Sequence, residues 1–155
     1  MPITLRDALP ADEVLLFALY ASSRAEEMAL VPWSDEQRDG FLRMQYDAQT
    51  THYRQAFPNA NFSVILRDEV PVGRLYVSRK ENEIRILDIT VLPELRNQGI
   101  GTAMLDDLVR EAAQLKKHVV IYVETFNPSL RLFERLGFKS IAEEGINFLM
   151  KYQPD

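Results

Sequence analysis

Apolar and polar residues follow two different spacings along the chain, and these spacings separate predicted helices from predicted strands. Apolar residues three and four positions apart indicate amphipathic helices, and such stretches cover residues 10–24, 34–57 and 101–115. Short stretches of β-branched and alternating apolar residues indicate strands, and these cover residues 3–7, 61–68, 70–79, 82–92 and 118–125. Residues 82–92 carry apolar groups on both faces, which is typical of a strand covered on both sides.

Local signals place the boundaries of the second predicted helix. Ser34 followed by Gln37 matches a capping box, so this helix is expected to begin there and to run to about Phe57, just before Pro58. The residues expected on its inner face are Phe41, Met44 and Ala48. For the first helix the expected inner face is Val14, Leu15, Ala18 and Leu19.

The end of the chain predicts one more helix and two more strands. Asn127 and Pro128 have the character of an N-cap and a first-turn proline, and Gly137 marks the expected end of this helix. Residues 138–153 are then expected to form two strands around Gly145. The complete prediction is one domain over residues 1–155 with the order β-α-α-β-β-β-α-β-α-β-β, a mixed α+β fold.

Composition narrows the class of protein. A length of 155 residues fits one domain, and a net charge of −5 does not favour nucleic acid as a partner. Without cysteine the chain has no disulfide, thiolate metal site or cysteine nucleophile, and His52 and His118 have no partner pattern for a metal. No apolar run reaches the roughly 18 residues of a membrane span, and the charged start is unlike a signal peptide. We therefore expect a cytoplasmic protein with no metal and no membrane partner.

Two glycines at the start of the third predicted helix suggest an anion site. The first N–H groups of a helix have no partner inside it and lie at the positive end of the helix dipole. Gly99 and Gly101 would leave these N–H groups open to a phosphate, with Arg96 as a nearby positive charge. The alternative is a helix start that needs positive φ or close packing. Neither a P-loop nor a dinucleotide fingerprint fits, because no Gly-Lys-Ser/Thr ending exists and Met104 stands where the third glycine should be.

Two segments together point to a known family. LDITVLPELRNQGIGTAMLDDLV has Val-x-Pro at Val91 and Pro93, followed by Arg-x-x-Gly-x-Gly at Arg96, Gly99 and Gly101. VETFNPSLRLFERLGF contributes a second block, matched at Asn127, Leu132, Gly137 and Phe138. Both blocks and the order of the elements resemble the GNAT superfamily of acyl-CoA-dependent N-acetyltransferases, whose signature is Arg/Gln-x-x-Gly-x-Gly/Ala. Residues 8–60 carry little family signature.

The resemblance implies a splayed, mixed, mostly antiparallel sheet flanked by helices, with acetyl-CoA held between the strands at 84–92 and 118–124. The backbone of Ile89 and Val91 would pair with the pantetheine arm, and the N–H groups of residues 97–102 would hold the pyrophosphate. The implied cofactor contacts are Ile89, Thr90, Val91, Arg96, Asn97, Gln98, Gly99, Ile100, Gly101, Thr102, Asn127 and Phe133.

The implied reaction is direct attack on the thioester by a primary amine of a small molecule or a peptide. An alkyl amine has a pKa of about 10.4 and is protonated at neutral pH, so a side chain or a water chain must accept its proton. A backbone N–H near Val91 or Leu92 is the candidate to stabilise the oxyanion.

The catalytic residues depart from the family pattern. The family's usual proton donor is a tyrosine, and Phe133 occupies its position here. Tyr122 is the candidate catalytic residue, because some members carry a catalytic carboxylate at that strand position; the alternative is an ordinary strand residue. Asp88 and Glu124 are candidate bases or structural carboxylates, and Arg85 stands where some members carry their base. An acyl-CoA-binding regulatory module with weak or no transferase activity is therefore the alternative function.

The acceptor side is expected near the first two helices, as in the family. Trp33 would stack on an acceptor or cap the core, and Glu26 and Glu27 would attract a cationic amine or remain solvated. A homodimer is a further expectation, since dimers are common in this family.

Overall fold

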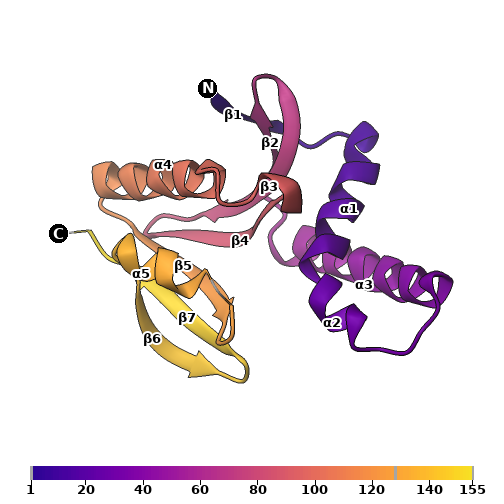
Figure 1. Cartoon of the computed structure of the whole chain (residues 1–155). Helices are drawn as coiled ribbons and strands as arrows, with labels where there is room; N and C mark the ends of the chain where they lie inside the picture. Colours follow the sequence, from indigo (N-terminus) through magenta and orange to yellow (C-terminus); the bar gives the residue numbers. More distant parts are fainter. Residues whose placement is uncertain (1, 128, 155) are drawn as a thin grey trace.

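The computed structural model describes residues 2–127 and 129–154, and it has one seven-stranded sheet flanked by helices (Figure 1). The strands are β1 (Ile3–Asp7), β2 (Asn61–Arg67), β3 (Val70–Arg79), β4 (Glu83–Val91), β5 (His118–Glu124), β6 (Lys139–Glu144) and β7 (Asn147–Tyr152). The helices are α1 (Glu13–Ser23), α2 (Ala25–Ala29), α3 (Asp35–Ala56), α4 (Ile100–Leu115) and α5 (Leu130–Arg135). Single 3₁₀ turns precede α1 (Pro10–Asp12) and follow β4 (Pro93–Leu95).

The strands are ordered β1-β2-β3-β4-β5-β7-β6 across the sheet. Every neighbouring pair is antiparallel except β4 and β5, which are parallel. The predicted fold class, a mixed and mostly antiparallel sheet with flanking helices, is therefore confirmed. The one parallel pair requires a crossover, and α4 provides it between β4 and β5.

Helices cover both faces of the sheet. On one face α4 and α5 enclose the larger core, in which Ile84 and Ile86 of β4 pack against Met104 and Leu105 of α4. On the other face α1 and α3 pack on Val64 and Leu66 of β2 in a second cluster. Both α4 and α1 contact β4, but only Ile84 and Ile86 of this strand are buried and the rest are half-buried, so the prediction of a strand covered on both sides was partly right.

The two N-terminal helices differ from the predicted faces. The capping box at Ser34 and Gln37 is present, with both reciprocal hydrogen bonds. The inward residues of α3 are Leu42 and Tyr46, whereas Met44 is 61% exposed, so the predicted face was wrong. The residues buried in α1 are Leu16, Leu19 and Tyr20, and Val14 is exposed. The predicted inner face of the first helix was therefore only partly right. α1 is apolar on nearly all sides, and α3 carries charged residues on all sides, so neither helix shows one clear apolar face.

The unpredicted element is α2. The first predicted helix, residues 10–24, opens as a 3₁₀ turn and ends at Ser23, where Arg24 leaves the helical conformation with φ −109° and ψ 2°. A separate single helical turn, α2, follows immediately. Its charged sequence contains no repeat long enough to predict it.

The C-terminal signals were partly right. Gly137 follows α5 with φ +99°, and Gly145 forms the turn between β6 and β7 with φ +62°. The N-cap of α5 is Ser129 rather than Asn127, so that prediction was wrong by two positions. Asn127 instead accepts a hydrogen bond at Oδ1 from the Ser129 N–H at 2.8 Å. The prediction for Pro128 lies outside the described residues.

Candidate functional site

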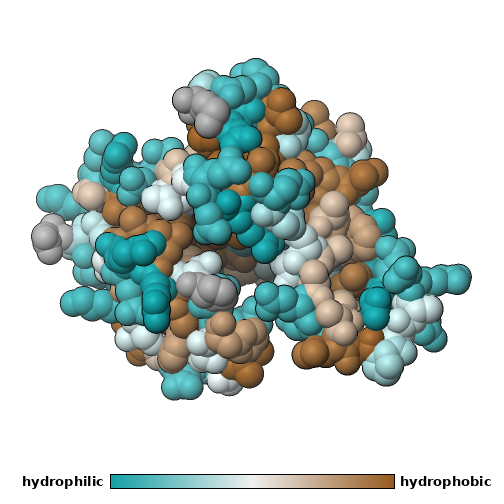
Figure 2. Space-filling model, in the orientation of Figure 1, coloured by the Kyte–Doolittle hydropathy of each residue, from teal (hydrophilic) through white to brown (hydrophobic). Residues whose placement is uncertain are grey.

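The sheet opens between its two parallel strands. Pairing joins only residues 83–86 of β4 to residues 118–121 of β5, and both strands continue beyond that point unpaired with each other. A bulge sits where they part, because Ile86 lies opposite Val77 while Asp88 already lies opposite Tyr76. In the space-filling view of the same face, the surface is hollowed near the centre, between the α1–α3 part and β5–β7 (Figure 2).

The bulged residue is held from α3. The Tyr53 hydroxyl donates to the Leu87 carbonyl at 3.0 Å. Burial, and then the negative charge of Asp88, raise the pKa of Tyr53 to about 12, so the phenol stays protonated and remains a donor at neutral pH. This contact fixes the point at which β4 leaves β5.

Both strands turn main-chain groups into the opening. The Leu92 N–H donates to the Val72 carbonyl at 2.9 Å. Since hydrogen-bonded and non-hydrogen-bonded pairs alternate along an antiparallel ladder, Thr90 bonds toward β3 whereas Ile89 and Val91 face the open side. The prediction that the Leu92 N–H could stabilise the oxyanion was wrong, because this N–H donates to Val72. The N–H groups of Ile89 and Val91 are directed at the opening.

The edge of β5 that faces β4 also turns main-chain groups into the opening. The Thr125 N–H donates to the Ile146 carbonyl at 2.8 Å. By the same alternation, the main-chain groups of Tyr122 and the N–H of Glu124 turn toward β4, while the Glu124 carbonyl accepts the Asn127 N–H. Within the described part of the sheet, the opening is thus bounded by main-chain donors and acceptors on both sides, which suits an extended, amide-containing ligand.

At the end of β4 the chain turns into the exposed N-terminus of α4. Gly99 is the N-cap with φ +83°, and Asn97 before it has φ +62°. Among the described residues no acceptor is found for the N–H groups of residues 97–102. The side chain of Ile100 is buried in the core, so at that position only the main chain can reach a ligand.

Gly99 and Gly101 differ in what their backbone conformation requires. A Cβ on either one would meet no atom within 4 Å, so close packing explains neither. Gly99 is required by its positive φ. Gly101 lies in the first turn of α4 with an ordinary helical conformation, so neither positive φ nor close packing requires a glycine there.

Two arginines lie at this corner, of which sequence analysis identified only one. Arg96 is exposed beside the glycines, as expected. Arg67, at the end of β2, donates to Gln98 Oε1 at 2.7 Å and so brings a second guanidinium to the loop. No local signal marks Arg67, because only the pairing of β2 with β3 and β3 with β4 brings it there. The corner is therefore more positive than the sequence alone suggested, despite the net charge of −5.

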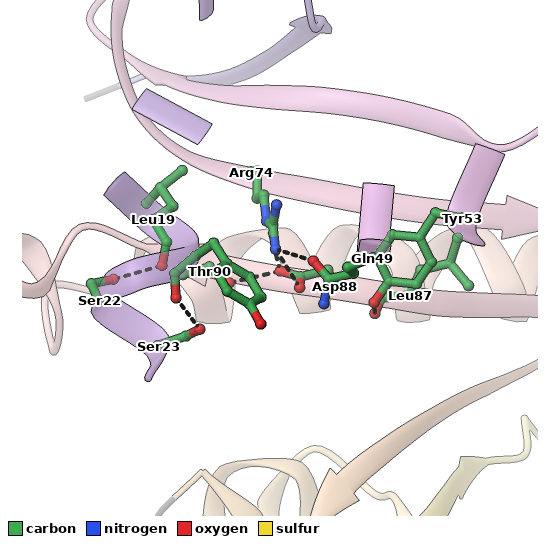
Figure 3. Close-up of polar contacts among 10 residues, drawn as sticks. Leu19, Ser22, Ser23, Gln49, Tyr53, Arg74, Leu87, Asp88 and Thr90 are labelled. Carbon is green, nitrogen blue, oxygen red and sulfur yellow. Dashed lines mark hydrogen bonds and ion pairs between the residues drawn. The ribbon is translucent and has the colours of Figure 1, made fainter. Parts of the chain in front are cut away.

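A buried polar network lies on the face of β4 that is turned away from α4 (Figure 3). Arg74 of β3 is 1% exposed, and its Nε and Nη2 donate to the two carboxylate oxygens of Asp88 at 3.1 and 2.8 Å. Nη2 also donates to Gln49 Oε1 at 3.1 Å, and the Thr90 hydroxyl donates to Asp88 Oδ1 at 2.7 Å. Burial lowers the pKa of Arg74, but attraction by Asp88 outweighs it and the pKa is raised overall. Asp88, a candidate base, is thus the counterion of a buried cation.

Tyr122 has a different neighbour from the one its candidate role requires. Its side chain is 45% exposed, and its hydroxyl donates to Glu144 Oε2 at 3.2 Å. The Arg85 guanidinium lies 5.7 Å from the ring centroid and is paired with Glu83 at 3.1 Å. The phenolic proton is therefore directed at β6 and not at the opening.

The remaining predicted site residues lie in α5, just before it and in the first turn of α4. Phe133 is buried and packs edge-on against Phe138, with ring centroids 5.5 Å apart. Asn127 lies just beyond β5, and its N–H donates to the Glu124 carbonyl at 2.9 Å. Thr102 is half-buried in the first turn of α4. No hydrogen bond or ion pair among the described residues joins these three side chains into a catalytic pair.

The candidate acceptor residues are mostly engaged in local contacts. Trp33 packs edge-on against Phe41, with centroids 5.1 Å apart, and Glu27 pairs with Arg24 at 3.1 Å. Over residues 2–127 and 129–154, no group of three or more metal-binding side chains is found. In the same residues, no helix is long and apolar enough to span a membrane.

An opened parallel strand pair that leads to an uncovered helix N-terminus is the geometry of an acyl-CoA-binding acetyltransferase fold. The family model for GNAT acetyltransferases matches residues 24–138, and the chain belongs to this family. A structure of PaiA N-acetyltransferase from Thermoplasma acidophilum in complex with coenzyme A has a TM-score of 0.73 to this chain at 19% identity, covering 99% of both chains. A structure of yncA from Salmonella typhimurium with acetyl-CoA has a TM-score of 0.60 at 23% identity, covering 100% of this chain and 95% of that one.

Part of the chain is also similar in sequence to a mammalian protein. The mouse cysteine-rich protein 2-binding protein is 33% identical to this chain over 97 residues, which are 61% of this chain. The match spans only 12% of the length of that relative. At their low identities the two solved structures show a common fold, and the residues of this chain must carry any argument about its chemistry.

Proposed function

We propose that the protein transfers an acetyl group from acetyl-CoA to a primary amine of a small molecule or a peptide. The observation that carries the proposal is the pairing of two features: an opening where β4 and β5 turn main-chain groups toward each other without pairing, and the uncovered N-terminus of α4 at its end. The first suits the amide-bearing pantetheine arm and the second suits a diphosphate. The PaiA and yncA structures, which hold coenzyme A and acetyl-CoA, add support.

The contacts proposed for the cofactor divide by chemistry. Ile89 and Val91 would bond the pantetheine arm through their main chain, and the N–H groups of residues 97–102 would hold the diphosphate. Arg96 and Arg67 would neutralise its charge, with Arg67 held at the loop by its hydrogen bond to Gln98. Asn127 would reach the arm from the other side of the opening, and the ring of Phe133 would support that wall from the core.

In the proposed reaction a neutral amine attacks the thioester carbonyl carbon. The C–N bond forms as the carbonyl oxygen gains negative charge, and the Ile89 N–H, directed into the opening at the bulge, is the proposed donor to it. The C–S bond then breaks, the coenzyme leaves as thiolate and takes up a proton, and the nitrogen loses one to solvent. Tyr122 remains a candidate for the proton to sulfur only if it leaves Glu144 during turnover.

A substitution at Gly101 tests the site directly. Gly101→Val should lower acetyl-CoA affinity at least tenfold while the protein stays folded, because a Cβ at this position meets no protein atom within 4 Å and the branched side chain would obstruct the helix N–H groups. Gly101→Ala is the matched control, since the family signature allows alanine there, and it should keep most of the affinity. The measurement is titration calorimetry with acetyl-CoA, with circular dichroism to check folding. Normal affinity in Gly101→Val would exclude this corner as the diphosphate site.

The alternative function is an acyl-CoA-binding module with weak or no transfer. Two observations favour it: Phe133 has no hydroxyl, and the Tyr122 hydroxyl is bonded to Glu144. A thiol-release assay separates the two functions, using acetyl-CoA with a panel of a polyamine, an aminoglycoside, a tripeptide α-amine and a lysine peptide. Release above the amine-free rate establishes transfer, whereas tight acetyl-CoA binding without release for any amine favours the module.

A further inference from the structure

The buried arginine of β3 makes the polar network on β4 rigid and electrically balanced. Taking a guanidinium out of water costs several kcal/mol unless it is paired and hydrogen-bonded, and Arg74 is 1% exposed. Two of its nitrogens contact both oxygens of Asp88, and the bond to Gln49 ties the pair to α3. Asp88 is therefore held in one orientation, with its charge compensated from the side of the core.

This orientation fixes the hydroxyl of Thr90. A hydroxyl has one proton to donate and two lone pairs that accept. The proton of Thr90 points at Asp88 Oδ1, 2.7 Å away, so its lone pairs are directed away from the carboxylate. Thr90 thus presents a hydrogen-bond acceptor whose direction is set by the ion pair behind it.

The position of Thr90 places this acceptor beside the opening. It lies between Ile89 and Val91, whose main-chain groups face β5, while its own side chain stands on the face of the sheet that α1 covers. Two other hydroxyls, Ser22 and Ser23 at the end of α1, lie on this side in Figure 3 and donate to the carbonyls of Leu19 and Tyr20. An amine reaching the opening from this face, opposite to α4, would pass Thr90.

We infer that Thr90 Oγ1 accepts a hydrogen bond from the attacking amine and aims its lone pair at the thioester, with Asp88 and Arg74 as positioning residues. The inference rests on the proposed acetyl transfer and adds a contact, not a proton-transfer step. An unpaired carboxylate here would attract the ammonium form, which has no lone pair for attack. A neutral oxygen backed by a balanced ion pair does not select that form so strongly, and it orients the amine that attacks.

The test compares Thr90→Val, which replaces the hydroxyl by a methyl group of similar size, with the wild type and Thr90→Ser. Wild-type thiol release is first measured with the four amines named above, and the best substrate is used for all variants. Thr90→Val should lower kcat/KM for that amine by 10- to 100-fold and leave the Kd of acetyl-CoA within about twofold, while Thr90→Ser should recover most of the loss. Thr4→Val, an exposed threonine of β1, is the control for the substitution itself.

The outcomes separate this inference from the proposed function. No release by the wild type with any amine would defeat the transferase proposal and this inference with it. Release by the wild type with kcat/KM of Thr90→Val within threefold would overturn the inference alone, as would equal losses in Thr90→Val and Thr90→Ser. A loss confined to acetyl-CoA affinity would make Thr90 a cofactor contact and would also overturn it.

Discussion

At the scale of single residues, an ion pair joins the first strand to the first helix. Both Asp12 oxygens lie 2.8 Å from Arg6 nitrogens, and Asp12 Oδ2 also accepts the Leu9 N–H at 2.7 Å. Hydrogen bonding to Arg6, chiefly, lowers the pKa of Asp12 from 3.8 to about 2. The pair therefore closes the turn that directs α1 back across the sheet.

The lowered pKa gives this pair a pH signature. Because the folded-state pKa lies below the unfolded value, the stabilisation is complete above about pH 4 and is lost as the pH falls toward 2. Asp12→Asn should cost about 1 kcal/mol of unfolding free energy at pH 7, a figure reduced for the partly exposed Arg6, and the cost should shrink over that pH range. Urea denaturation at several pH values measures it, with Asp7→Asn as the control. A cost that stays constant down to pH 2 would contradict the assignment.

The structural roles of single residues could be predicted from the sequence where a local rule determines them. Ser34, Gln37 and Gly99 follow from what helix starts require. Arg67 and Thr90 could not be assigned in this way, because their roles depend on a strand register that no local rule supplies. Arg74 is the extreme case, since a charged residue in a strand would ordinarily be placed at the surface.

At the scale of elements, two glycines predict opposite effects of the same substitution. A Cβ at Gly73 of β3 would lie 2.4 Å from the Thr90 carbonyl oxygen, a backbone atom, whereas at Gly40 inside α3 it would meet nothing within 4 Å. Gly73→Ala should destabilise the protein by about 1–3 kcal/mol through overpacking. Gly40→Ala should stabilise it by about 1 kcal/mol through helix propensity. Guanidinium denaturation of both variants measures the difference. A Gly73→Ala variant as stable as the wild type would contradict the close approach of β3 to the Thr90 carbonyl, and a destabilised Gly40→Ala would contradict the open space at Gly40.

Element boundaries were more predictable than element faces. The bounds of β3, β4 and β5 agree with the predicted ranges within one residue, since strands here end at turns and at Pro93. The inner face of α3 was wrong because it packs only part of its length on the sheet, with Leu42 and Tyr46 as its buried residues. A long helix with charged residues on all sides does not reveal which stripe a neighbour will cover.

At the scale of the whole molecule, the two parts of the sheet are joined at one short pairing. Residues 83–86 and 118–121 connect β1–β4 to β5–β7, and the opening lies beyond them. A ligand that bonds the free groups along both edges would act as an additional strand between the parts. Binding should therefore stabilise the molecule as a whole, by about 2.7 kcal/mol at a concentration of one hundred times Kd.

Amide hydrogen exchange resolves this expectation by residue. In the free protein the N–H groups of Ile89 and Val91 should exchange faster than those of Thr90 and Leu92, because the latter bond to β3. Saturating acetyl-CoA should slow Ile89 and Val91 at least tenfold and change Thr90 and Leu92 much less. Coenzyme A without the acetyl group is a useful comparison for Ile89, the proposed oxyanion donor. Uniform protection along β4 would argue against the alternating pattern.

The sequence by itself determined the strands and the helices other than α2, the capped start of α3 and the glycine corner before α4, because each depends on residues a few positions apart. Only the tertiary structure decided where β4 leaves β5, which main-chain groups face that opening, and that Arg74, Asp88 and Thr90 form one network. These features arise from strand register and from α3 packing over β4. Register is a property of pairs of strands, and it cannot be read from either strand alone.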